Sequence, residues 1–196
     1  TRGGLTFDGQ DAHAAFKGGN AKAMRRRIQM IFQDPYASLN PKIKIGNAIA
    51  EPMLLHGQAS SYAEAKEKIQ HLLEVVGLQP AVFDRYPHEF SGGQRQRIGI
   101  VRALAVNPKL IFCDESVSAL DVSVQAQIIG ILKEVQEEEN ISYLFISHDL
   151  DLLRACCHRI GILNRGKLVE MEETERLFHS PAAPYTKELI SAFFTF

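Results

Sequence analysis

The sequence is poor in cysteine, and its three cysteines, Cys113, Cys156 and Cys157, form no recognisable framework. An odd number with one adjacent pair and no CxxC spacing argues against disulfides and against a cysteine metal site, and it favours reduced cytosolic thiols. Long apolar runs are also missing, since none approaches the roughly 18 residues that a membrane-spanning helix needs. These absences exclude a disulfide-stabilised secreted domain and a chain that itself spans a membrane.

An excess of charge of one sign is absent too. Lys and Arg total 22 and Asp and Glu total 23, so the formal net charge is -1. A dedicated nucleic-acid-binding protein usually carries a basic excess, so we expect no nucleic acid as partner. Hydrophobic residues make up 45% of the chain and charged residues 23%, as in an ordinary globular domain. The length of 196 residues fits one domain, or one domain with a small inserted lobe.

Hydrophobic patterning predicts strands that alternate with helices. Short apolar runs predict strands at 28–32, 110–113 and 143–146, and the continuous run at 110–113 suits a strand buried on both faces of a parallel sheet. Apolar stripes predict helices at 45–55, 62–76, 124–135 and 150–155, and a hairpin signal lies at 164–166, whereas 12–22 is interpreted as a loop or a weak helix. The order favours an α/β core with a helical lobe inserted between strands.

The segment from Phe90 to Gln94 has two interpretations. Ser91 and Gln94 have the spacing of a capping box, in which the two side chains satisfy backbone groups at the start of a helix. A cap does not explain Gly92 and Gly93, each of which costs up to about 1 kcal/mol in a helix relative to Ala. Bare backbone at a helix N-terminus suits the close approach of a phosphate.

Two acidic residues, Asp114 and Glu115, directly follow the apolar run at 110–113. They can simply be loop residues or the cap of a helix. Acids at the carboxyl end of a parallel strand also face the crevice where α/β proteins bind ligands. There one carboxylate can hold Mg²⁺, and the other can orient or deprotonate a water molecule.

Taken in order, the segments FSGGQRQR, LIFCDE, SALD and ISHDL resemble the ATP-binding-cassette (ABC) ATPases. They correspond to the signature motif (residues 90–97, with Phe90 in place of the usual Leu), the Walker B strand, the D-loop and the switch histidine of that family. Gln33 corresponds to the glutamine of the Q-loop, and Ser116 replaces the proline common after the Walker B acids. The segments FQDPYASLNP and LFHSPAAPYTKELISA look most like the ATPase subunits of bacterial oligopeptide and dipeptide importers.

The resemblance implies a role for each matching residue in binding ATP and Mg²⁺. Asp114 would bind Mg²⁺, and Glu115 would polarise the attacking water. His148 would contact the γ-phosphate and the water. The alternative, which is commoner for a lone histidine at a strand end, is that its hydrogen bonds are made within the protein and it binds no ligand. Gln33 would reach Mg²⁺ or the water and report the nucleotide state to a membrane subunit; the alternative is a solvated loop glutamine.

The remaining residues are implied to act across a dimer of cassettes. Asp121 would contact the partner cassette, and the alternative is that it only caps the helix that starts at Val122. The signature residues that would bind the γ-phosphate held by the partner are Ser91, Gly92, Gly93 and Gln94.

One departure from the family is serious, because no GxxxxGK[ST] motif occurs. That P-loop supplies the backbone amides and the lysine that hold the phosphates of ATP. The chain also starts at Thr1 without an initiator methionine or a signal peptide. We therefore expect a cassette cut at its N-terminus, and possible truncation after Phe196, and we expect the 196 residues alone not to hydrolyse ATP.

The fold class expected from the resemblance is α/β, a partial P-loop NTPase-type ABC cassette with an inserted α-helical subdomain. Its expected parts are core strands and Q-loop at 1–41, the helical subdomain with the signature motif at 42–106, Walker B, D-loop and switch histidine at 107–171, and a C-terminal helical extension at 172–196.

The expected function is ATP hydrolysis that drives import of peptides or a similar small solute, at the cytoplasmic face of the cell membrane. The expected partners are a second ABC ATPase subunit, either the same or a paralogous one, membrane-spanning permease subunits that dock near residues 32–40 and the helical lobe, and indirectly a solute-binding protein. Two alternatives stay open. One is a non-catalytic truncated cassette that regulates or assembles, which the missing P-loop favours. The other is a soluble ABC ATPase acting on DNA or ribosomes, which the short spacing between the motifs disfavours.

Overall fold

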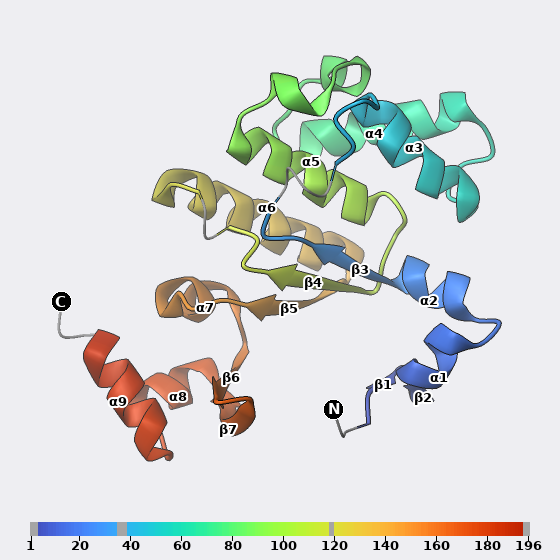
Figure 1. Ribbon diagram of the computed structural model, residues 1–196. Helices are drawn as coiled ribbons and strands as arrows, with labels where there is room; N and C mark the ends of the chain where they lie inside the picture. The colour runs from blue at the N-terminus through green and yellow to red at the C-terminus, as the bar shows by residue number, and fades with distance from the viewer. Residues whose placement is uncertain (1–3, 35–38, 118–119, 194–196) are drawn as a thin grey trace. The chain divides into compact units, whose positions relative to one another are not determined.

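A computed structural model describes residues 4–34, 39–117 and 120–193 (Figure 1). The chain divides into two compact units, Thr1–Ile146 and Ser147–Phe196, and each is described here by itself. This division does not test the four parts predicted from the sequence, and their boundaries stay predictions. Among the described helices, none is long and apolar enough to cross a membrane.

The centre of the first unit is a three-stranded parallel sheet. Its order is β3 (Ile28–Ile31), β4 (Leu110–Asp114) and β5 (Ser142–Ile146), with Ile31 opposite Cys113 and Asp114 opposite Ile146. Helix α6 (Val122–Glu139) connects β4 to β5. Parallel strands joined by a helical crossover form an α/β core, as the sequence predicts. Because the strands are parallel, their carboxyl ends meet at one edge of the sheet.

The two faces of this sheet differ in burial. On one face Ile31, Ile111 and Cys113 are fully buried, and α6 contributes its own buried stripe at Ile128, Leu132 and Val135. On the other face Leu144 and Ile146 are 47% and 48% exposed, and Phe112 is only half-buried. The expectation that the strand at 110–113 is buried on both faces is therefore wrong. A continuous apolar run shows that both faces of a strand can be buried. Whether the second face is buried depends on another element that packs against it.

Between β3 and β4 the chain forms a group of helices, which lies above the sheet in Figure 1. These are α3 (Ile45–Leu55), α4 (Tyr62–Val75), the 3-10 helices η1 (Pro80–Asp84) and η2 (Pro87–Glu89), and α5 (Gly92–Leu104). Ile69 and Leu73 of α4 are fully buried, as the predicted stripe requires. Gly77 ends this helix with φ +71, a conformation that favours glycine. The predicted spans at 45–55 and 62–76 are confirmed to within one residue.

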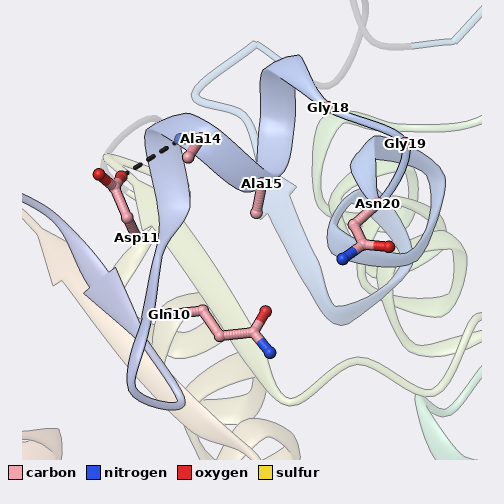
Figure 2. A pocket seen from close by; sticks show the side chains of 7 residues that line it. All are labelled: Gln10, Asp11, Ala14, Ala15, Gly18, Gly19 and Asn20. Carbon is pink, nitrogen blue, oxygen red and sulfur yellow. Dashed lines mark hydrogen bonds between the residues drawn. The ribbon is translucent and has the colours of Figure 1, made fainter.

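The N-terminal part begins with a small antiparallel hairpin, β1 (Thr6–Phe7) and β2 (Gln10–Asp11), followed by α1 (Ala12–Lys17) and α2 (Ala21–Arg27). The Asp11 carboxylate accepts hydrogen bonds from the backbone N–H groups of His13, at 2.8 Å, and Ala14, at 3.2 Å (Figure 2). This cap fixes the first turn of α1. The segment 12–22, interpreted from sequence as a loop or a weak helix, thus contains α1, a turn at 18–20 and the start of α2.

The second unit contains α7 (Leu150–Cys156), an antiparallel hairpin of β6 (Arg159–Asn164) and β7 (Lys167–Glu173), α8 (Thr174–His179) and α9 (Pro184–Phe193). The predicted hairpin is confirmed, and its turn has Arg165 and Gly166 at φ +48 and +76. The Glu170 carboxylate of β7 accepts hydrogen bonds from the N–H groups of Ala182 and Ala183, at 2.7 and 3.0 Å. This contact ties the hairpin to the start of α9.

Candidate functional site

Asp114 and Glu115 lie at the carboxyl edge of the central strand. Asp114 is the last residue of β4, and the backbone N–H of Glu115 donates to the carbonyl of Ile146, at 2.9 Å. Glu115 has φ +42, which is uncommon for a residue other than glycine. Both carboxylates are half-buried. The backbone at Glu115 therefore fixes the direction in which its side chain starts.

Gln33 and Glu115 meet at this edge. Gln33 comes two residues after β3, and its amide Nε2 donates to Glu115 Oε2, at 2.7 Å. The contact follows from the parallel pairing of β3 with β4, which brings the two strand ends together. Of the residues predicted for the site, these two are joined by a direct side-chain hydrogen bond. Gln33 is itself exposed, as expected for a loop glutamine, and its predicted action on Mg²⁺ or on the water stays a prediction.

The oxygen atoms gathered here suit a hard cation. Carboxylates of Asp114 and Glu115 and the amide oxygen of Gln33 are donors of the kind that Mg²⁺ prefers. Within residues 4–34, 39–117 and 120–193, no three His, Cys, Asp or Glu side chains gather closely enough to hold a metal ion by themselves. Mg²⁺ commonly binds one or two carboxylates together with water and substrate phosphates. The donor set fits that arrangement, in which a phosphate ligand completes the coordination.

The signature motif begins helix α5. Ser91 Oγ accepts from the N–H of Gln94, at 3.3 Å, and Gln94 Oε1 accepts from the N–H of Ser91, at 3.0 Å. The capping box predicted from sequence is therefore confirmed. Gly92 is exposed and a Cβ built on it would meet open space, whereas Gly93 lies against Val124 of α6. Binding of a phosphate by these residues stays a prediction.

A residue that the sequence interpretation missed supports this motif. Arg95 is buried, and its guanidinium donates through Nε, at 2.8 Å, and through Nη2 to the carbonyl of Phe90. The Phe90 ring is itself buried and lies under the guanidinium of Arg85, whose Cζ is 4.8 Å from the ring centroid. These contacts hold the loop that enters α5. A charged residue inside a helical pattern gives no sequence signal that it will be buried.

Asp121 caps helix α6. Its Oδ1 accepts from the N–H of Val124, at 3.0 Å, and from the hydroxyl of Ser123, at 2.7 Å. The hydrogen bond from Ser123 and then that from the backbone of Val124 lower the pKa of the Asp121 carboxyl. The capping interpretation is thus confirmed, and the contact across a dimer stays a prediction. The preceding D-loop residues, Ser118 and Ala119, lie outside the described residues.

His148 belongs to the second unit. It is exposed and lies just before α7, between Ser147 and Asp149. Ser147 Oγ accepts from the N–H of Asp149, at 3.0 Å, and Asp149 Oδ1 accepts from the N–H of Leu152, at 3.1 Å. These bonds shape the turn that carries the histidine. Its proximity to Glu115 stays a prediction.

Two surface pockets lie away from these residues. Asp11, small residues and Asn20 line the first, between α1 and α2 (Figure 2). The second lies beside β3 and includes Arg25, Phe32 and Arg102. None of the predicted site residues lines either pocket.

Comparison with known proteins gives concordant results. A family model described as "ABC transporter" matches residues 1–118. The oligopeptide transport ATP-binding protein OppF of Bacillus subtilis is 48% identical over 192 residues, which are 98% of this chain and 63% of OppF. The glutathione import ATP-binding protein GsiA of Pectobacterium atrosepticum is 50% identical over 97% of this chain and 30% of its own length. The chain thus spans less than two thirds of these relatives.

A solved structure agrees with the fold. A dimeric ATP-binding cassette in a post-hydrolysis state, bound to ADP and Pi, superposes with a TM-score of 0.77 at 27% identity, covering 89% of this chain and 74% of that one. This confirms the predicted P-loop NTPase-type fold class. With the family match over residues 1–118, the sequence relatives and the shared fold, the chain belongs to the ABC transporter family.

Proposed function

We propose that this chain is part of an ATP-hydrolysing subunit of an importer for peptides or a similar small solute. It is the part that carries the catalytic carboxylates and the signature motif. The observation that carries the proposal is the 2.7 Å hydrogen bond from Gln33 to Glu115, which orients a carboxylate at the carboxyl edge of a parallel sheet beside Asp114. The names of the relatives, which include oligopeptide, dipeptide and glutathione transport proteins, support the substrate class.

In this function each residue at the sheet edge has one task. Asp114 holds Mg²⁺, which neutralises charge on the phosphate oxygens of ATP. Glu115 orients and polarises the attacking water, and Gln33 holds the Glu115 carboxylate in place. His148 contacts the γ-phosphate. Catalysis of phosphoryl transfer then depends on positioning and electrostatics rather than on covalent chemistry.

The proposed assembly contains two ATPase subunits on the cytoplasmic face of a membrane. Each ATP lies between Asp114 and Glu115 of one subunit and the signature residues Ser91–Gln94 of the other. Permease subunits dock near residues 32–40 and the helical lobe, and a solute-binding protein delivers the solute. Within the docking segment, residues 35–38, including Tyr36 and Ser38, lie outside the described residues.

A second candidate function is a non-catalytic module that assembles or regulates without turnover. The observation that favours it is the lack of a GxxxxGK[ST] segment in the 196 residues. The oriented carboxylate of Glu115 favours the catalytic function instead. Its side chain is held by Gln33 at the carboxyl edge of the sheet, directly after Asp114.

The substitution Glu115→Gln tests the proposed function in the complete gene product, with whatever flanks residues 1–196. The amide keeps the shape of the side chain but cannot act as a base, so we expect ATP binding to persist and steady-state hydrolysis to fall by about 10²–10⁴-fold. Glu138→Gln, a change at an exposed carboxylate on α6, is the matched control and should leave hydrolysis unchanged. Hydrolysis near the wild-type rate in Glu115→Gln would remove Glu115 from this role.

A further inference from the structure

The two glycines of the signature motif have different surroundings. A Cβ built on Gly92 has no heavy atom within 4 Å, so the chain itself has room for a side chain there. A Cβ built on Gly93 would lie 3.0 Å from Val124 Cγ1, which is closer than ordinary van der Waals contact. Within the described part of the chain, a neighbour in α6 therefore leaves no room for a side chain at position 93. No neighbour there restricts the size of the residue at position 92.

Val124 is not free to give way. It is β-branched, and in a helix one χ1 rotamer of valine is strongly preferred. It lies in the first turn of α6, where its backbone N–H donates to the capping carboxylate of Asp121, at 3.0 Å. A larger residue at position 93 would thus push the start of α6, together with its cap, away from the start of α5.

A second contact lies one turn further along the same two helices. Arg97 of α5 donates through Nη2 to Gln127 Oε1 of α6, and through Nη1 to the carbonyl of Val76, at 2.7 Å, at the end of α4. The contacts of Gly93 with Val124 and of Arg97 with Gln127 form a seam between α5 and α6. The seam fixes how the first turns of the two helices lie against each other.

We propose that Val124 is a positioning residue for the signature motif. It contacts the first turn of α5 at Gly93 and so sets the distance between Ser91–Gln94 and the Asp121 cap of α6. In consequence Gly93 is required by Val124, whereas Gly92 is required by a group outside this chain. The effect on nucleotide-driven association rests on the proposed function; the packing of Gly93 against Val124 does not.

The first experiment is a double-mutant cycle on thermal stability in the complete gene product. Gly93→Ala should lower the melting temperature by about 2–10 °C, the range that overpacking of this kind produces in a domain of this size. In a Val124→Ala background, the same Gly93→Ala change should no longer lower it. Val122→Ala is the matched control, because Val122 is on the same helical turn but 80% exposed, and it should give no rescue.

The second experiment separates positioning from packing. Val124→Ile adds one methylene to the contact with Gly93, and it should raise the ATP concentration needed for half-maximal dimerisation by at least about fivefold, with ATP binding to the single subunit unchanged. Gly92→Ala should also impair dimerisation without lowering the melting temperature, and Val124→Ala should not rescue it. Size-exclusion chromatography with light scattering and equilibrium nucleotide titration provide the measurements.

The outcomes are distinguishable. Equal effects of Gly93→Ala in the wild-type and Val124→Ala backgrounds, or equal rescue by Val122→Ala and Val124→Ala, overturn the proposal. A third outcome is that Val124→Ala rescues stability while Val124→Ile dimerises at the wild-type ATP concentration. The contact would then contribute only to stability, and the positioning role would be rejected. If the complete gene product neither dimerises with ATP nor hydrolyses it, the proposed function fails, while the stability cycle still decides whether Val124 is the reason for Gly93.

Discussion

At the scale of single residues, the backbone of Glu115 constrains the site most strongly. A non-glycine residue with φ +42 costs about 1–2 kcal/mol relative to the right-handed region. The hydrogen bond from Glu115 N to Ile146 O holds this conformation, so the carboxylate starts from a fixed position. Only the outer part of the side chain is left to be oriented, and Gln33 does this.

We predict that Gln33→Ala lowers turnover more than it lowers ATP affinity. The substitution removes the amide that holds the Glu115 carboxylate, and a hydrogen bond to a charged group of this kind corresponds to a loss of roughly 10–100-fold in rate. Steady-state kinetics on the complete gene product should therefore show a reduced kcat with a smaller change in KM. Gln29→Ala is the control, since the Gln29 amide donates to the backbone of Arg25 instead. Equal losses in the two variants would contradict this assignment.

How far single residues could be predicted depends on what fixes them. Gln33 and Glu115 follow the ends of β3 and β4, and parallel pairing brings such ends together, so their meeting was predictable in outline. The contact of Gly93 with Val124 was not, because it depends on how two helices far apart in the sequence pack. The same holds for Arg95, whose burial depends on the loop at Phe90 folding back over it.

At the scale of elements, the Glu64 carboxylate in the first turn of α4 holds the residue that precedes the Ser61 cap. Glu64 accepts hydrogen bonds from the Lys68 ammonium, at 2.7 Å, and from the hydroxyl and N–H of Ser60, at 2.6 and 2.8 Å. The bond from Lys68, followed by those from Ser60, lowers the pKa of Glu64 from 4.5 to about 2. A carboxyl whose pKa is lowered by folding stabilises the folded state above its unfolded pKa, and the stabilisation is lost as the pH falls towards its folded pKa.

We therefore predict that Glu64→Gln lowers the melting temperature at neutral pH and that the difference from wild type shrinks as the pH falls from 4.5 to about 2. Thermal melts followed by circular dichroism over this pH range test it. Glu67→Gln, which changes an exposed carboxylate on the same helix, should have a smaller effect at every pH. A constant difference between wild type and Glu64→Gln across the range would show that the carboxylate acts in another way.

Among whole elements, those with long hydrophobic stripes were the most predictable. Helices α3 and α4 have apolar residues at helical spacing and clear ends, and the predicted spans agree with the structure. Helices α1 and α2 are too short for such a stripe, and the useful signal was Asp11, whose side chain caps α1. The partial exposure of β4 could not be predicted from its own residues, because burial of a face is decided by the elements that cover it.

At the scale of the whole molecule, we predict that the 196-residue chain alone does not turn over ATP. In-line phosphoryl transfer needs the triphosphate held and its charge neutralised, and the sequence has no P-loop to do so. Asp114 and Glu115 alone would present negative charge to a negative ligand. Titration with Mg-ATP by calorimetry, together with a phosphate-release assay, provides the test. Micromolar binding with steady turnover in the purified chain would show that other groups hold the phosphates.

The open face of the parallel sheet has a consequence for handling this chain. Leu144 and Ile146 are about half exposed at alternate positions of β5, and the half-buried Phe112 pairs with Leu144. Association through apolar surface weakens on cooling and strengthens on warming. A cold solution of the chain should therefore stay clear, become turbid on gentle warming before any secondary structure is lost, and clear again when chilled. Leu144→Lys should suppress this reversible clouding, whereas Leu54→Lys, at an exposed position on α3, should not.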